Sequence, residues 1–103
     1  MTTTAMTLTE NTVQAYTLVV GLGVSGLSVA RYLTAKGQPV VIVDSRAIPP
    51  GIEQCQQQLP GVEVITGEFD WQVFENASQL IVSPGVALTE PAIQHAIHKG
   101  TEV

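Results

Sequence analysis

Residues 17–26 read Thr-Leu-Val-Val-Gly-Leu-Gly-Val-Ser-Gly, a short apolar run that leads into three glycines spaced as G-x-G-x-x-G. The apolar run at 17–20 is typical of a buried strand. From Val24 to Lys36 the apolar residues recur with the period of a helix, and Gly37 follows as a stop. A buried strand that turns on glycines directly into a helix predicts the first unit of an α/β fold with a parallel sheet.

The rest of the chain continues this alternation of strands and helices. Asp70 can cap a single helical turn, and Trp71 and Phe74 in that turn are expected to anchor a loop to the core. Residues 101–103 look like the start of a fifth strand. The other elements are expected as strands at 39–43, 62–66 and 80–82, and as helices at 52–59 and from 89 to about 99.

Right-handed crossovers assemble elements in this order into one parallel sheet. The strand at 39–43 is apolar throughout, which indicates a sheet that is covered on both faces. We therefore expect residues 16–103 to form an α/β domain, a Rossmann-like doubly wound parallel sheet of about five strands with helices on both faces. Residues 1–15 are rich in Thr and lack the features of a secretory signal, so a flexible, cytoplasmic leader is expected there.

The composition disfavours several classes of function. The 103 residues carry 4 Lys and Arg against 9 Asp and Glu, and the net charge of −5 disfavours nucleic acids and anionic membrane surfaces as partners. Cys55 is the only cysteine, which excludes an internal disulfide. The apolar runs are far shorter than the roughly 20 residues that cross a bilayer. His95 and His98 lack a third ligand at a recognisable spacing, so no metal site is expected.

The glycine motif carries the strongest chemical signal. Its glycines allow the backbone to turn tightly and to approach a diphosphate, while unpaired N–H groups and the positive end of the helix dipole attract the anion. Gly23, Val24, Ser25 and Gly26 are therefore candidate binding residues. The alternative is that the glycines only let the helix and the strand pack closely.

Asp44 ends the second predicted strand, 23 residues after Gly21. Carboxyl ends of strands in open α/β sheets border the ligand crevice. There a carboxylate accepts a hydrogen bond from a ribose 2′-OH in dinucleotide enzymes, and it can equally accept the N3–H of uracil. Asp44 can instead cap the turn that holds Ser45 and Arg46. The Arg46 guanidinium can stack on a base, pair with a phosphate, or remain a solvated loop charge.

Ser83, Pro84 and Gly85 follow the fourth predicted strand, at the same edge of the sheet. A turn of this kind brings backbone close to whatever the glycine motif holds, and Gly85 leaves room for it. An ordinary turn between a strand and a helix is the alternative. No G-x-S-x-G elbow is present and no base can be identified for Ser83, so no catalytic residue is expected.

Three runs together resemble a known family. VVGLGVSGLSVARYL at 19–33, VVIVDSRAIPPG at 40–51 and LIVSPGVAL at 80–88 are similar, in this order and spacing, to the N-terminal domain of the Mur ligases of peptidoglycan synthesis. Among these, they resemble the ligases that add D-glutamate to UDP-N-acetylmuramoyl-L-alanine. The resemblance covers residues 16–103 and implies a domain that binds the UDP part of this substrate.

The resemblance also implies roles for particular residues. Val24 and Ser25 are expected to contact the diphosphate and the uridine, and Asp44, Ser45 and Arg46 are expected to lie on the uracil side. Ser83 and Gly85 are expected to be UDP-binding residues on the opposite wall, where Gly85 brings backbone close to the ligand. A nicotinamide-dinucleotide (NAD) module of a regulatory or redox protein, with the same topology, is the alternative function.

A full ligase of this family uses ATP and magnesium and has central and C-terminal domains, which are expected to be missing from this chain. Lys36 and Lys99 are its only lysines, and neither stands in a G-x-x-x-x-G-K-[ST] phosphate loop. We therefore expect the chain, truncated from a larger three-domain ligase, to bind substrate without cofactors and to be inactive alone. A cytoplasmic location is expected.

Overall fold

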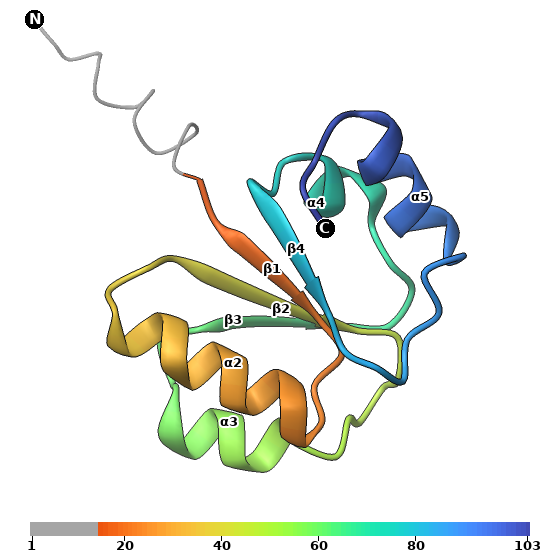
Figure 1. Cartoon of the computed structure of the whole chain (residues 1–103). Helices are drawn as coiled ribbons and strands as arrows, with labels where there is room; N and C mark the ends of the chain where they lie inside the picture. The colour runs from red at the N-terminus through yellow and green to blue at the C-terminus, as the bar shows by residue number, and fades with distance from the viewer. Residues whose placement is uncertain (1–14) are drawn as a thin grey trace, which may run out of the picture.

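The computed structural model describes residues 15–103, so the predicted leader lies outside the described residues except for Ala15. Strands and helices alternate along the chain in the predicted order (Figure 1). They are β1 Thr17–Val20, α2 Val24–Ala35, β2 Val40–Asp44, α3 Ile52–Gln58, β3 Glu63–Thr66, α4 Trp71–Glu75, β4 Gln79–Val82 and α5 Pro91–His98.

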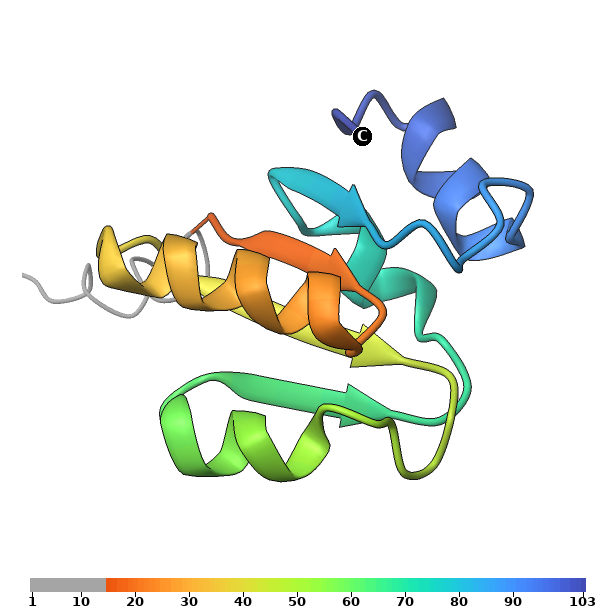
Figure 2. The same ribbon diagram turned by 60° about the horizontal axis from the view of Figure 1, so that its bottom comes forward.

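The strands form one parallel sheet in the order β3-β2-β1-β4. Val19 in the central strand β1 pairs with Ile42 of β2 on one side and with Ile81 of β4 on the other. Figure 2 shows the four arrowheads pointing to the same side of the molecule. The loops that follow β1, β2 and β4 therefore start at one edge of the sheet, where a ligand crevice is expected in such folds.

The sheet has four strands in the described residues, and the prediction of about five was wrong in this respect. Glu102 forms an isolated parallel bridge with Gln79, and its carbonyl accepts a hydrogen bond from the N–H of Leu80 at 2.8 Å. A strand requires several consecutive pairs, and only one pair forms here. Residues 101–103 thus lie beside β4, where a fifth strand was expected, without extending the sheet.

Both faces of the sheet are covered by helices, as predicted, because side chains of a strand point alternately to its two faces. On β1, Leu18 and Val20 face one side and Val19 faces the other. The first two pack with residues of α4 and α5, among them Phe74 and Ile93. Val19 packs with residues of α2 and α3. Figure 1 shows these two helix pairs on opposite sides of the sheet.

The short helix α4 confirms one part of its prediction and contradicts another. Asp70 caps it, since its carboxylate accepts a hydrogen bond from the N–H of Gln72 at 2.9 Å. Phe74 is fully buried, but Trp71 is 48% exposed and does not anchor the loop to the core. The Trp71 ring lies instead against His95 of α5, with 4.8 Å between ring centroids. Of the two aromatic residues of α4, only Phe74 therefore belongs to the core.

Among residues 15–103, no helix combines the length and the apolar character needed to cross a membrane.

Candidate functional site

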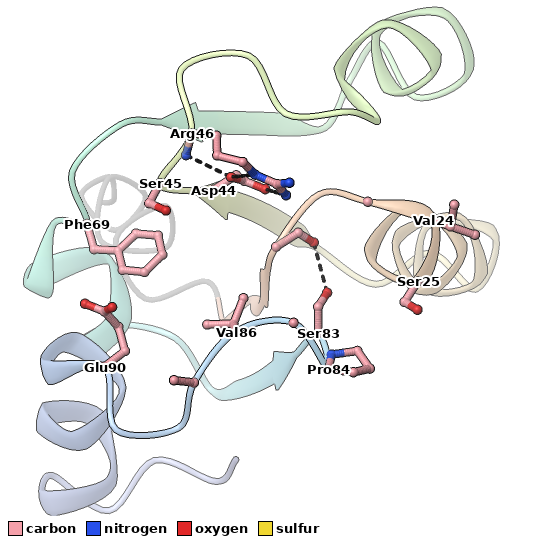
Figure 3. Close-up of a pocket in the computed structure, with 14 residues that line it drawn as sticks. Val24, Ser25, Asp44, Ser45, Arg46, Phe69, Ser83, Pro84, Val86 and Glu90 are labelled. Atoms are coloured by element: carbon pink, nitrogen blue, oxygen red, sulfur yellow. Dashed lines mark hydrogen bonds and ion pairs between the residues drawn. The ribbon is translucent and has the colours of Figure 1, made fainter.

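An open pocket of about 590 Å³ lies at the carboxyl edge of the sheet. Its walls are the loops after β1, β2 and β4, with a contribution from the loop after β3 (Figure 3). This volume is within the range of small-molecule sites in proteins. The lining residues are Gly21, Gly23, Val24, Ser25, Asp44, Ser45, Arg46, Phe69, Ser83, Pro84, Gly85, Val86, Ala87 and Glu90.

Two glycines of the motif are required by the chain's own packing. Gly21 has a φ of +105°, a conformation that disfavours side chains, and a Cβ on it would lie 2.8 Å from the Ser83 hydroxyl oxygen. A Cβ on Gly26 would lie 1.9 Å from the Gly21 carbonyl oxygen. The start of α2 therefore packs directly on the end of β1, as the alternative explanation of these glycines proposed.

Gly23 and Gly85 differ from that pair. Neither has a positive φ, and a Cβ on either would have no heavy atom within 4 Å beyond its chain neighbours. The packing of the described chain thus gives no reason for glycine at these two positions. Both glycines line the pocket from different loops, so close approach by a ligand is a reason that remains.

The N-terminus of α2 opens onto the pocket between these glycines. Gly23 is the N-cap and has no side chain that could accept a hydrogen bond from the first turn. The first intrahelical bond runs from the N–H of Leu27 to the Gly23 carbonyl at 3.0 Å. The N–H groups of Val24, Ser25 and Gly26 precede this bond and have no acceptor within the helix. Val24, which is 89% exposed, and Ser25 both line the pocket. Such an end favours an anion.

Asp44 holds the glycine loop and its own turn together. Its carboxylate is 3% exposed and accepts a hydrogen bond from the N–H of Leu22 at 2.8 Å. Arg46 donates three more, from its backbone N–H at 2.9 Å, from Nε at 2.9 Å and from a terminal guanidinium nitrogen at 2.7 Å. Each carboxylate oxygen receives two of these four bonds, which fills its acceptor positions.

The same contacts set the charge state of Asp44. The hydrogen bonds from the Arg46 side chain, the largest cause, and those from the Leu22 and Arg46 backbones lower the pKa of Asp44 from 3.8 to about 2, against the opposing effect of burial. Asp44 is therefore ionised at neutral pH. The turn-capping role predicted as an alternative for Asp44 is present in the structure, and the Arg46 side chain, 55% exposed, is paired with it.

Ser83 connects the opposite wall to the glycine loop. Its hydroxyl donates to the Gly21 carbonyl at 3.2 Å, and its backbone N–H donates to the Val20 carbonyl at 3.0 Å. Pro84 and Gly85 follow as an exposed turn on the pocket wall. Figure 3 shows the Ser83 hydroxyl pointing at the glycine loop.

Eight of the nine site residues expected from the sequence meet around this pocket. The exception is Gly26, which is buried under the glycine loop and does not line the pocket. Ser45 and Gly85 are exposed on the rim, on different walls. The eight residues are Gly23, Val24, Ser25, Asp44, Ser45, Arg46, Ser83 and Gly85.

Sequence reasoning missed part of one wall, formed by Phe69, Val86 and Glu90. In Figure 3 Phe69 and Glu90 lie at the end of the pocket away from Val24 and Ser25. Phe69 comes three residues after β3. Residues that follow parallel strands lie at the carboxyl edge of the sheet, so the reasoning applied to Asp44 and Ser83 was sufficient to find it. Glu90 is the N-cap of α5 and had no comparable signal.

Within residues 15–103, no group of three or more His, Cys, Asp and Glu residues gathers closely enough to hold a metal ion. His95 lies away from the pocket lining and pairs with Glu75, with 2.6 Å between Nε2 and Oε2. The polar groups around the pocket are backbone N–H groups, the Asp44 carboxylate paired with Arg46, the Glu90 carboxylate, the Arg46 guanidinium and serine hydroxyls.

Comparisons with known proteins show which family this chain belongs to. Residues 15–103 match the family model described as Mur ligase MurD-like, N-terminal domain. The UDP-N-acetylmuramoylalanine--D-glutamate ligase of Shewanella violacea is 48% identical over 86 residues, 84% of this chain and 19% of the relative. The enzymes of that name from Nitrosococcus oceani and Marinobacter nauticus are 45% and 42% identical, over 88% and 84% of this chain and 20% of each relative. The chain spans about a fifth of these relatives, and it belongs to the family of MurD-like Mur ligase N-terminal domains.

Proposed function

We propose that residues 16–103 form the UDP-binding domain of an ATP-dependent ligase that adds D-glutamate to UDP-N-acetylmuramoyl-L-alanine in peptidoglycan synthesis. The observation that carries the proposal is the uncapped N-terminus of α2, which opens onto a pocket between two glycines that packing does not require. The relatives of this chain are named for that ligase activity. Because the chain spans a fifth of their length, the activity is that of a longer protein.

In this proposal the diphosphate binds at the start of α2. There the N–H groups of Val24 and Ser25 and the Ser25 hydroxyl are the available donors, and Gly23 lets phosphate oxygens approach the backbone. The net charge of −5 cannot attract an anion to the chain. Binding of a diphosphate therefore depends on these local dipoles and on the guanidinium of Arg46, and not on the overall field.

In this proposal the uracil lies on the side of Asp44, Ser45 and Arg46, and Ser83 and Gly85 belong to the opposite wall; all five residues line the pocket. For Asp44 to accept the N3–H of uracil, the Arg46 guanidinium has to release one carboxylate oxygen, since all acceptor positions are filled. Arg46 is more than half exposed, so its side chain can leave Asp44 without disturbing the core. A released guanidinium is free to stack on the base.

The other functions of the ligase are assigned to parts of the protein outside this chain. The central and C-terminal domains of the family would supply the ATP, magnesium and D-glutamate sites, so we propose that this segment binds UDP-N-acetylmuramoyl-L-alanine without ligating it. The proposed place of action is the cytoplasm, where ATP is available. Neither a nucleic acid nor a membrane has a part in this proposal.

Calorimetric titration of the 103-residue chain with UDP, UDP-N-acetylmuramic acid and NAD tests the proposal. Both uridine ligands are expected to bind more tightly than NAD, and NMR amide shifts on adding UDP are expected to be largest around Val24 and Arg46. Tighter binding of NAD than of both uridine ligands would overturn the proposal in favour of a dinucleotide module. Shifts confined to residues outside the pocket would overturn the assignment of the site.

A further inference from the structure

The peptide group between Gly21 and Leu22 is held at both of its polar ends by side chains from neighbouring strands. Its carbonyl oxygen accepts the Ser83 hydroxyl at 3.2 Å, at the end of β4. Its N–H donates to the Asp44 carboxylate at 2.8 Å, at the end of β2. Since β1 lies between β2 and β4 in the sheet, the two side chains approach this peptide from opposite sides.

Packing further restricts the same peptide group. The Gly21 carbonyl oxygen lies so close to Gly26 that a Cβ there would be 1.9 Å away. The preceding φ of +105° belongs to a conformation that glycine adopts and leaves easily, so this peptide would otherwise be a natural point of rotation. Rotation would break both side-chain hydrogen bonds and move the carbonyl out of the space that Gly26 leaves for it. These contacts fix the orientation of the Gly21–Leu22 peptide at the start of the glycine loop, beside backbone hydrogen bonds that the Gly21 N–H and the Leu22 carbonyl make.

The Ser83 hydroxyl has one proton, and it donates this proton in a hydrogen bond to the Gly21 carbonyl. The Ser83 hydroxyl therefore has no second proton to donate to a phosphate. The next residues along the glycine loop, Gly23 to Ser25, carry the free N–H groups at the start of α2. Any tilt of the Gly21–Leu22 peptide changes the direction of those groups.

We propose that Ser83 is a positioning residue, whose hydroxyl acts through the Gly21–Leu22 peptide to aim the N–H groups of the glycine loop at the ligand's diphosphate. This inference rests on the proposed function, since it assigns Ser83 a part in holding UDP without touching it. Asp44 is the second holder of the same peptide group. Ser83 thereby links the wall after β4 to the geometry of the loop after β1.

The other end of β4 offers a matched control. Ser78, just before β4, donates its hydroxyl to the Tyr16 carbonyl at 2.9 Å, just before β1. Ser78 and Ser83 thus tie the same two strands together at opposite ends with the same kind of hydrogen bond. Only the bond of Ser83 reaches the glycine loop.

The test titrates UDP and inorganic pyrophosphate into the unsubstituted chain and into Ser83→Ala, Ser83→Thr and Ser78→Ala. Ser83→Ala is expected to weaken both ligands about three- to tenfold, the scale of one neutral hydrogen bond. Ser83→Thr keeps the hydroxyl and is expected to bind like the unsubstituted chain. Ser78→Ala is expected to lower the melting temperature no more than Ser83→Ala does, because its hydrogen bond is exposed and the Tyr16 carbonyl keeps the Ser78 N–H, and to leave both affinities within twofold. The carbonyl ¹³C shift of Gly21 is expected to move only in Ser83→Ala.

The outcomes separate this inference from the proposed function. If the unsubstituted chain does not bind UDP, the proposed function fails and this inference fails with it. If it binds UDP and Ser83→Ala binds within twofold, the inference alone is overturned. Equal weakening by Ser78→Ala would also overturn it, because the bond would then act only through general stability. If Ser83→Ala does not fold, Ser83→Cys keeps the side-chain size with a weaker donor and is expected to weaken both ligands; unchanged binding would overturn the inference.

Discussion

The two edges of this sheet are built from the same strands and both are hollowed, but they differ in what they offer a ligand. The carboxyl edge carries the pocket of about 590 Å³, and the amino edge carries a second hollow of about 490 Å³. At the carboxyl edge α2 begins, with free N–H groups next to Asp44 and Ser83. At the amino edge α2 ends at Ala35, and the backbone N–H of its C-cap Lys36 is paired with carbonyls of the last turn.

This difference shows that hydrogen bonds between strands do not by themselves make a site. Ser78 at the amino edge ties β4 to β1 as Ser83 does at the carboxyl edge. The direction of the chain decides which edge carries the helix N-termini, because parallel strands joined by helices place every following helix N-terminus at the same edge. The helix N-termini at the carboxyl edge favour an anion electrostatically, while the helix C-termini and Glu63 at the amino edge disfavour one.

The largest expected difference between the two edges is in stability, and glycine substitutions test it. Gly26→Ala places a Cβ against the Gly21 carbonyl and is expected to cost more than about 4 kcal/mol, because backbone has to move. Gly61→Ala, at the amino edge, meets nothing within 4 Å and is expected to change stability by less than about 1 kcal/mol. Urea denaturation of both variants measures this. A Gly26→Ala chain of unchanged stability would contradict the packing described for α2.

The next largest effect concerns binding at Gly23. Gly23→Val is expected to leave the fold intact, since the position is open, and to weaken UDP about a hundredfold by blocking phosphate approach, equivalent to about 2.7 kcal/mol. Gly61→Val is the control and is expected to leave UDP affinity unchanged. Unchanged calorimetric affinity in Gly23→Val would remove the glycine loop from the site.

A further comparison sets Asp44 against a capping aspartate outside the pocket. Asp44→Ala is expected to lower UDP affinity by about 1–3 kcal/mol and to destabilise the fold by a similar amount, because the Leu22 N–H loses its acceptor. Asp70→Ala, which removes the cap of α4, is expected to reduce stability by about 1 kcal/mol without affecting UDP.

Pyrophosphate separates two ways in which Asp44 can act. If Asp44 contacts only the uracil, Asp44→Ala loses affinity for UDP and keeps its affinity for pyrophosphate. If Asp44 acts by holding the glycine loop, both affinities fall. Unchanged binding of both ligands would reduce Asp44 to a residue that caps its own turn.

The smallest expected effect is a dependence of stability on acid pH. The pKa of Asp44 is about 2 in the folded chain against 3.8 ordinarily, so its ionised form stabilises the fold above about pH 4. That contribution is lost as the pH falls through 2. We expect about 1–2 kcal/mol, reduced by the exposure of Arg46. The difference in unfolding free energy between the unsubstituted chain and Asp44→Asn should shrink between pH 5 and pH 2.5, and a constant difference would contradict the pairing described.

Much of the fold was predictable because its signals are local. The apolar run at 17–20, the helical period after it and the capping Asp70 each depend on neighbours in sequence, and each element formed where it was expected. The fifth strand and the buried Trp71 were predicted wrongly because both depend on partners distant in sequence. A strand requires an adjacent strand, and the direction of an aromatic side chain depends on what α5 places beside it.

The sequence by itself determined that the chain is an α/β domain whose glycine loop, Asp44 and Ser83 meet at one edge, since strand direction and spacing follow from local pattern. Tertiary structure alone decided what each of these residues does there. It divided the glycines into those required by packing, Gly21 and Gly26, and those open to the pocket, Gly23 and Gly85. It also paired the Asp44 carboxylate oxygens with N–H groups of Leu22 and Arg46. The physical reason is that hydrogen-bond partners and free space are properties of three-dimensional neighbours, which a linear pattern does not specify.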